Sequence, residues 1–184
     1  MNTNNNFQKP RIILLSDLWG KEKTGWIAYY TNILEKHFEV AFYDSCDIGN
    51  VDKSDYSKER LHEQFIAGGI QRAVEYLIQK EKGIINILAF SIGGFIAWKA
   101  CLAGLKAQHL FAISSTRLRH ETQKPDGAIE LIYGENDTYK PDHEWFQKLE
   151  IKEFFYKNEA HEFYKKKELA EDLCRMIIEK LQEN

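Results

Sequence analysis

An alternation of short apolar runs with longer amphipathic stretches constrains the fold of this chain more than any other feature. A run of six or seven mainly apolar residues between polar ones is typical of a strand buried on both faces of a parallel sheet. Six such runs occur along the chain, at residues 11–16, 39–44, 84–90, 109–115, 128–133 and 151–156. We therefore expect a sheet of about six strands.

The stretches between these runs carry apolar residues at intervals of three and four, which places them on one face of an α-helix. The longest stripe spans residues 58–81, and shorter stripes occur at residues 26–34 and 169–181. Such stripes usually pack in a core, so we assign them no chemistry. Strands that alternate with helices are joined by right-handed crossovers, which predicts a three-layer α/β/α fold around a mostly parallel sheet.

Length and charge bound the domain organisation and the classes of partner. A chain of 184 residues with 43% hydrophobic content is the right size for one core. We expect a single domain over residues 10–184, after a flexible tail at residues 1–9. The net charge of −3 provides no basic field that would attract a nucleic acid or an anionic membrane surface.

Cysteine usage and apolar run lengths indicate where the protein resides. The three cysteines form no CxxC pair and leave one thiol over in any disulfide scheme, which fits a reducing compartment. The N-terminal residues lack the apolar stretch of a secretory signal, and no run of about 18 apolar residues is present to span a bilayer. These features predict a cytoplasmic protein. The pattern leaves the oligomeric state open, because it does not distinguish exposed from covered sheet edges.

Reactive side chains follow the predicted strands at four places. Ligands bind beyond the carboxyl ends of the strands in a parallel sheet, so these segments are the candidates for a site. They are SDLWG at 16–20, SIGG at 91–94, YGENDTYKP at 133–141 and NEAHEF at 158–163. No pair of histidines stands at metal-ligand spacing and no glycine-rich phosphate loop is present, so we expect neither a metal nor a cofactor.

Ser91, Asp137 and His161 can act together as a nucleophile, an acid and a base. A serine hydroxyl is a weak nucleophile until a histidine accepts its proton, and the histidine needs a carboxylate to fix its tautomer and orientation. Their order along the chain is the Ser…Asp…His order of the α/β-hydrolases. The backbone N–H of Ile92, which follows Ser91 at the start of a predicted helix, can donate to a tetrahedral oxyanion.

Each of these assignments has a rival in the sequence. Ser91 is also a favoured residue for the N-cap of a helix. Glu135 and Asp142 compete for the role of the acid, because the whole segment is rich in turn-forming residues. His143 competes for the role of the base, but it follows a proline where a helix is expected to begin.

From Arg11 onward the sequence resembles the α/β-hydrolases, and among them most closely the dienelactone hydrolase-like enzymes and small serine esterases. DLWG is similar to that group's acidic-apolar-aromatic-glycine segment, AFSIGG to its nucleophile turn and AHEF to its histidine loop. Ala89 replaces the first glycine of the G-x-S-x-G nucleophile elbow, and dienelactone hydrolase itself carries a cysteine where Ser91 stands. Little sequence separates residues 113–115 from 128–133, so we expect a compact core with little or no lid.

The resemblance implies a serine hydrolase with a catalytic triad of Ser91, Asp137 and His161. Such an enzyme cleaves an ester or thioester of a small carboxylic acid through an acyl-enzyme, and its substrate is a small molecule. The resemblance also implies that the backbone N–H of Leu18 completes the oxyanion hole, with Trp19 as the alternative donor and as part of the substrate pocket.

Two further points stay open in the sequence. Arg117 and Arg119 either attract a substrate carboxylate or belong to a solvated loop. The second hypothesis for the whole chain is a non-catalytic protein of the same fold that binds a small ligand or a protein partner, with Ala89 as the first departure from the catalytic motif.

Overall fold

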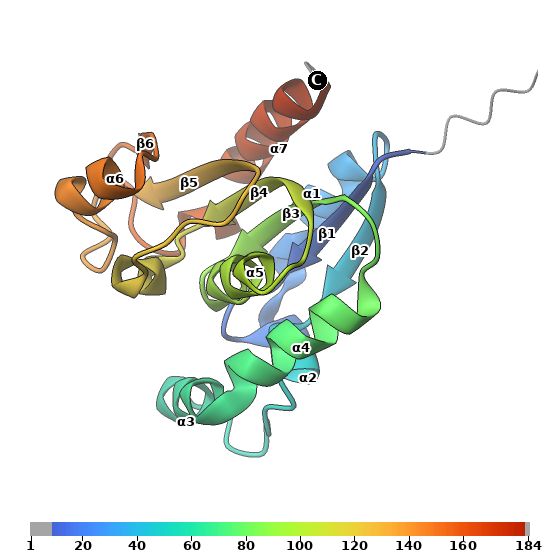
Figure 1. Cartoon of the computed structure of the whole chain (residues 1–184), viewed down its shortest axis with the longest axis vertical. Helices are drawn as coiled ribbons and strands as arrows, with labels where there is room; N and C mark the ends of the chain where they lie inside the picture. The colour runs from blue at the N-terminus through green and yellow to red at the C-terminus, as the bar shows by residue number, and fades with distance from the viewer. Residues whose placement is uncertain (1–8, 183–184) are drawn as a thin grey trace, which may run out of the picture.

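The computed structural model describes residues 9–182, and a six-stranded parallel sheet lies at its centre (Figure 1). The strands are β1 (Arg11–Leu15), β2 (Glu39–Tyr43), β3 (Ile85–Phe90), β4 (Ala107–Ile113), β5 (Ala128–Gly134) and β6 (Glu153–Tyr156). Their spatial order is β2-β1-β3-β4-β5-β6, and every neighbouring pair is parallel. The predicted sheet is confirmed. Residues 1–8 of the predicted tail lie outside the described residues.

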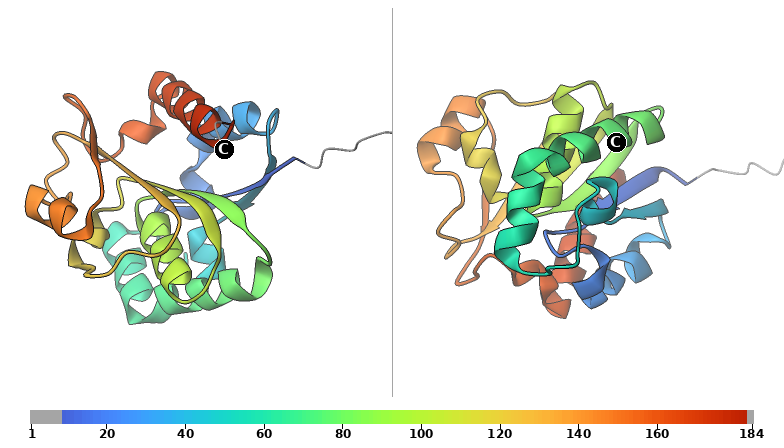
Figure 2. Two further views of the ribbon diagram at one scale, coloured as in Figure 1. Left: turned by 45° about the horizontal axis from the view of Figure 1, so that its top comes forward. Right: turned by 90° about the horizontal axis from the view of Figure 1, so that it is seen from below.

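Helices cover both faces of the sheet, as the alternating pattern predicts (Figures 1 and 2). One face packs against α1 (Ala28–Leu34) and α7 (Lys167–Gln182), and the other against α4 (Ile70–Lys80), α5 (Ile92–Leu102) and α6 (His143–Leu149). The short helices α2 (Ser45–Ile48) and α3 (Lys58–Gln64) complete the second layer. The three-layer α/β/α architecture is therefore confirmed.

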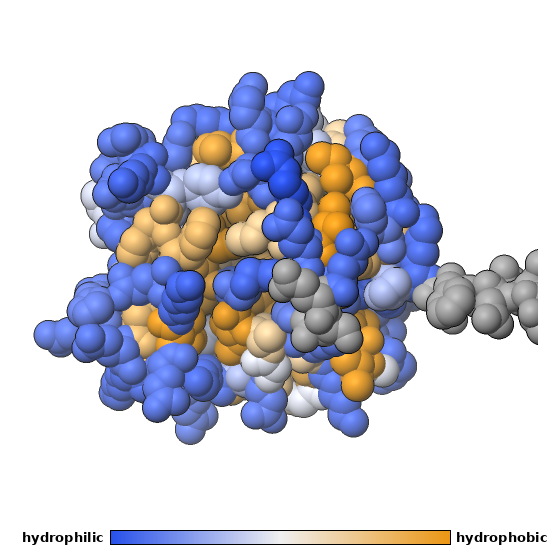
Figure 3. Space-filling view, turned by 90° about the horizontal axis from the view of Figure 1, so that it is seen from above, coloured by the Kyte–Doolittle hydropathy of each residue, from blue (hydrophilic) through white to orange (hydrophobic). Residues whose placement is uncertain are grey.

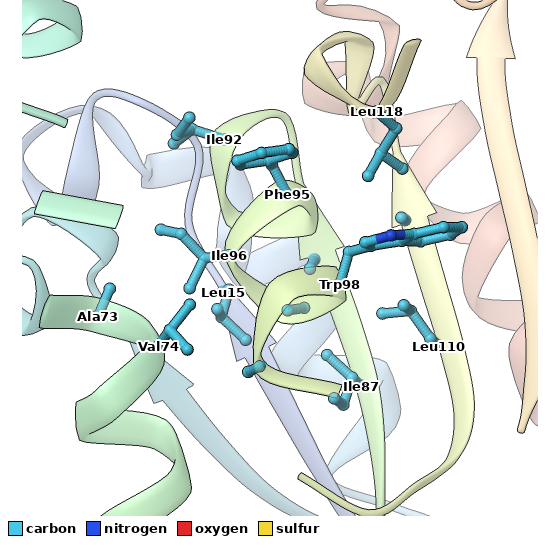
Figure 4. Close-up of a cluster of buried hydrophobic side chains, with 14 of the residues drawn as sticks. Leu15, Ala73, Val74, Ile87, Ile92, Phe95, Ile96, Trp98, Leu110 and Leu118 are labelled. Carbon is cyan, nitrogen blue, oxygen red and sulfur yellow. The ribbon is translucent and has the colours of Figure 1, made fainter. Parts of the chain in front are cut away.

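The core is built from alternate residues of the central strands, because successive side chains of a strand point to opposite faces. In β3, Ile87 and Ala89 belong to the cluster under α4 and α5, whereas Leu88 and Phe90 belong to the cluster under α1 and α7. All four are fully buried. Figure 4 shows the first cluster, in which α5 lies on the sheet and sends Trp98 toward β4. This packing holds α5 against the sheet, and the helix begins directly beyond the carboxyl end of β3.

The single helix predicted over residues 58–81 is wrong, because the structure divides it. A π-helical turn at Phe65–Gly69 separates α3 from α4, and Gly68 there has a φ of 131°. Only glycine adopts such a backbone without a steric cost. The apolar spacing continues through the break, so periodicity alone did not reveal it. The break sets α3 at an angle to α4 and brings one face of α3 to the candidate site.

Figure 3 shows one face of the molecule, on which hydrophilic side chains surround smaller apolar areas. The helix α7 has one apolar and one charged side. Ala170, Leu173, Cys174 and Ile177 face the sheet and are buried, while the charged residues between them reach solvent. Within residues 9–182, no helix has both the length and the apolar character needed to cross a membrane.

Candidate active site

The predicted site residues meet at the carboxyl ends of the strands, around one cavity of about 750 Å³. Ser91 follows β3, Asp137 follows β5, and His161 lies between β6 and α7. The loop after β1 brings Leu18 and Trp19 to the same cavity, and Ile92 lines it from the start of α5. Segments that are far apart in the sequence converge here because all six strands run in the same direction.

Ser91 stands in a strained turn between β3 and α5. Its φ of 51° and ψ of −115° are rare for any residue other than glycine. The backbone N–H of Ser91 donates to the carbonyl of Ile113 at 2.8 Å, which holds the turn against β4. Ser91 occupies the N-cap position of α5, yet its side chain makes no capping hydrogen bond. The hydroxyl is directed elsewhere, so capping does not account for this serine.

A chain of two hydrogen bonds joins Ser91, His161 and Asp137. The Oγ of Ser91 lies 3.1 Å from Nε2 of His161, and Nδ1 of His161 lies 2.7 Å from Oδ2 of Asp137. The Asp137 side chain is only 2% exposed, and its second oxygen accepts the backbone N–H of Tyr139 at 3.1 Å. A buried carboxylate held from both sides can fix the imidazole with Nδ1 protonated, so that Nε2 is free to accept the serine proton.

The three rival residues have other partners. Glu135 accepts the backbone N–H of Asn158, and Asp142 caps α6 by accepting the backbone N–H of Trp145. His143 begins α6, as predicted, and pairs with Glu153 on the surface. None of the three rivals lines the cavity that Ser91 faces, as far as the described residues define it.

Close backbone contacts hold the loops of Asp137 and His161 together. Gly134 ends β5, and a Cβ at this position would stand 2.4 Å from the carbonyl oxygen of Glu159. The backbone N–H of Asn136 donates to that same carbonyl at 2.8 Å. Only a residue without a side chain permits this approach, which sets the carboxylate and the imidazole at hydrogen-bonding distance.

Ser114 supports the histidine loop and was missed in the sequence. Its Oγ donates to the carbonyl of His161 at 2.7 Å, and the residue is fully buried with a φ of 51°. Ser114 follows β4 at the same edge of the sheet as Ser91. Its position at a strand end was the available signal, but the contact depends on a loop about 47 residues further along the chain.

Two backbone N–H groups in the segments around Ser91 have no acceptor among the described residues. Ile92 is the first residue of α5, so its N–H has no carbonyl partner in the preceding turn. In the loop after β1, the N–H of Trp19 donates to Oδ1 of Asp17 at 3.1 Å, whereas the N–H of Leu18 has no acceptor among the described residues. Leu18 is therefore the freer donor of the two, and Trp19 contributes its side chain to the cavity wall.

Asp17 and Gly93 determine where the Leu18 loop lies. The Asp17 carboxylate is buried and also contacts the Tyr164 hydroxyl at 3.1 Å and Nζ of Lys165 at 3.0 Å. A Cβ on Gly93 would stand 2.4 Å from the Ser16 carbonyl oxygen. The absence of a side chain at Gly93 thus lets α5 approach the loop directly.

The three cysteines of the described residues are held in the protonated form. Burial raises the pKa of Cys46, Cys101 and Cys174 to about 12, so their thiols stay protonated at neutral pH. Within residues 9–182, no group of three or more His, Cys, Asp or Glu side chains is arranged to hold a metal ion.

Comparison with solved structures shows that this chain shares its fold with α/β-hydrolases. A candidate hydrolase of the α/β superfamily from Xanthomonas campestris pv. campestris superimposes with a TM-score of 0.67 and 18% identity, covering 96% of this chain and 100% of that chain. Est1E from Butyrivibrio proteoclasticus, with ferulic acid bound, gives a TM-score of 0.67 at 12% identity and covers 100% and 94%. The NocB thioesterase domain, in a covalent complex with a fluorophosphonate nocardicin G analogue, gives 0.57 at 14% identity and covers 94% and 95%.

Sequence comparison adds nothing to these structural likenesses. No protein-family model matches the chain, and no curated protein matches it in sequence. The closer resemblance to dienelactone hydrolase-like enzymes stays a prediction. The sheet order, the helical layers and the structural neighbours agree that this chain has the α/β-hydrolase fold.

Proposed function

We propose that this protein is a serine hydrolase that cleaves an ester or thioester of a small carboxylic acid. The observation that carries the proposal is the hydrogen-bonded chain from Ser91 through His161 to the buried Asp137, at the wall of a cavity. A serine, a histidine and a carboxylate in this relation activate the hydroxyl for attack on a carbonyl carbon.

The reaction proceeds through an acyl-enzyme. The Oγ of Ser91 attacks the carbonyl carbon while Nε2 of His161 accepts its proton, and Asp137 stabilises the imidazolium that forms. The backbone N–H groups of Ile92 and Leu18 donate to the oxyanion of the tetrahedral intermediate. His161 then gives its proton to the leaving alcohol or thiol. A water molecule, deprotonated by His161, releases the carboxylic acid and restores Ser91.

The strained backbone of Ser91 argues against the non-catalytic alternative. A residue in such a conformation costs on the order of 1–3 kcal/mol, and strain of this kind concentrates at sites where it serves the mechanism. A protein that only binds a ligand in this cavity gains nothing from a serine held in this way. The cavity beside Ser91 is also open to a substrate, because Trp19 lines it without filling it and about 750 Å³ is free.

Covalent labelling tests the proposal directly. A fluorophosphonate probe should form an adduct on Ser91, located by peptide mass mapping, and Ser91→Ala should abolish it. His161→Ala should slow labelling by about 10²-fold or more, the usual contribution of a general base. His143→Ala is the matched control and should label at the wild-type rate. The proposal fails if the folded protein remains unlabelled where a known serine hydrolase is labelled, or if His143 rather than His161 controls the rate.

A further inference from the structure

The cavity wall carries basic side chains that have no acidic partner in the described part of the chain. Lys58 and His62 reach the cavity from α3, and Arg117 and Arg119 reach it from the 3₁₀ turn Thr116–His120. No carboxylate within residues 9–182 lies at ion-pair distance from Lys58, Arg117 or Arg119. This cluster is separate from the three residues that the proposed hydrolysis uses.

The acidic residues of the same cavity already have partners within its wall. Asp17 and Glu162 share Lys165, whose Nζ lies 3.0 Å from the first carboxylate and 2.6 Å from the second. Asp137 accepts from His161 at 2.7 Å. With neutral histidines, Lys165 and the three basic side chains of the wall slightly outweigh Asp17, Asp137 and Glu162, although the whole chain carries a net charge of −3.

Arg117 is the member of the cluster that has a buried hydrogen-bond donor without a partner. Its side chain donates no hydrogen bond to any described residue, and its Nε is completely buried without a partner. The guanidinium lies 5.2 Å from the ring centroid of Phe95 in α5, which holds it over an apolar surface. A buried donor without a partner costs about 1–3 kcal/mol. Arg117 as a whole is only partly buried and lines the cavity, so a ligand there can reach its side chain.

Two neighbouring histidines report the same positive potential. Burial, and then the charges of Arg117 and Lys58, lower the pKa of His62. Burial, followed by the charges of Arg119 and Arg117, lowers the pKa of His120. Both histidines therefore favour the neutral form. The break between α3 and α4 is what brings His62 and Lys58 to this side of the cavity.

We infer that Arg117 binds an anionic oxygen group, a carboxylate or a phosphate, on the part of the substrate remote from the bond that is cleaved. The inference rests on the proposed function, because it names the substrate class of the same cavity: an ester or thioester that carries a second, negatively charged group. The planar guanidinium offers paired N–H donors to two oxygens of such a group. Lys58 and Arg119 at the cavity wall add attraction without a fixed geometry.

A matched pair of esters tests this inference through its kinetics. Mono-p-nitrophenyl adipate carries a terminal carboxylate, and p-nitrophenyl hexanoate has the same chain length without the charge. Arg117→Gln should lower kcat/KM for the adipate ester by about 10- to 100-fold, the range expected for charge-assisted hydrogen bonds, and should leave the hexanoate ester within about twofold. Arg60→Gln is the matched control. Arg60 lies on α3, as Lys58 does, but it pairs with Glu63 outside the cavity, so its loss should change the hydrolysis of neither ester.

A binding measurement separates this inference from the proposed function. Ser91→Ala cannot hydrolyse, and calorimetric titration with monomethyl adipate, butyl phosphate and neutral dimethyl adipate measures recognition alone. If either anion binds at least tenfold more weakly to Ser91→Ala/Arg117→Gln than to Ser91→Ala, the anion site is supported. The anion that binds more tightly to Ser91→Ala identifies the natural group. Equal binding of neutral and anionic probes, or an Arg117→Gln effect of the same size on both esters, overturns the inference. Anion binding in a protein that hydrolyses neither ester and is not labelled at Ser91 by the fluorophosphonate would uphold the site and refute the hydrolase.

Discussion

Replacing Gly93 with alanine tests whether the site depends on the direct approach of α5 to the loop after β1. The added methyl carbon would stand 2.4 Å from the Ser16 carbonyl oxygen and 2.9 Å from Cβ of Leu15. Ordinary contact begins at 3.4 Å, so the gap to the carbonyl must widen by about 1 Å. The Ser16 carbonyl cannot turn aside freely, because it accepts the Ser45 hydroxyl at 2.7 Å.

The expected effects on stability and activity follow from this geometry. Overpacking of a close contact costs about 1–3 kcal/mol, which for a chain of this size lowers Tm by about 2–12 °C. A 1 Å separation also moves the Leu18 N–H away from the Ile92 N–H. Loss of one oxyanion donor costs about 10²- to 10³-fold in kcat, so we expect a fall of that order with a smaller change in KM.

The assay combines thermal unfolding with hydrolysis of a p-nitrophenyl ester. Gly25→Ala is the control, because Gly25 has no positive φ and a Cβ there meets no atom within 4 Å. That variant should match the wild type in both measurements. A Gly93→Ala protein with unchanged Tm and unchanged kcat would refute the reasoning, because it would mean that the loop yields without consequence for the site.

Three further predictions concern the acid Asp137, the loop that carries His161, and the carboxylate of Glu81. Asp137→Asn should keep the fold but reduce kcat by about 10⁴-fold, since the amide favours the wrong imidazole tautomer; unchanged turnover in steady-state assays would move the role of the acid to another residue. Ser114→Ala removes the hydroxyl that donates to the His161 carbonyl and should lower kcat by about 10- to 100-fold through displacement of the imidazole; wild-type kcat would show that the loop needs no such support. Burial raises the pKa of Glu81, but its hydrogen bonds from Arg11 and Tyr43 outweigh this and hold the pKa below the ordinary value of 4.5. The Glu81 carboxylate thus stabilises the fold fully above pH 4.5, and this contribution is lost as the pH falls through the lowered pKa. The Tm of Glu81→Gln should therefore fall less steeply than the Tm of the wild type as the solution is acidified. Parallel curves of Tm against pH for the two proteins would exclude this linkage.

The missing glycine of the nucleophile motif shows how sequence and structure divide the explanation. In the sequence, Ala89 departs from the G-x-S-x-G pattern. In the structure, Ala89 is a fully buried residue of β3, between Leu15 of β1 and Ala112 of β4. A small residue fits this interior position, so the departure does not remove the turn that follows. At Gly93, by contrast, a neighbouring backbone carbonyl leaves no space for a methyl group.

The sequence by itself determined the six strands, the two helical layers and the parallel direction of the strands. Apolar periodicity follows directly from burial on a strand or a helix, and strands that alternate with helices run parallel. It also placed Ser91, Asp137 and His161 after strands, and parallel strands end at one edge. Tertiary structure alone decided the rest. The break at Gly68 and the hydrogen bond that occupies the N–H of Trp19 are local, but the spacing of apolar residues does not reveal them. The support of His161 by Ser114 depends on a contact between segments distant in the sequence, as does the position of Arg117 over Phe95. Local periodicity carries no information about such contacts, because each depends on how two packed loops meet.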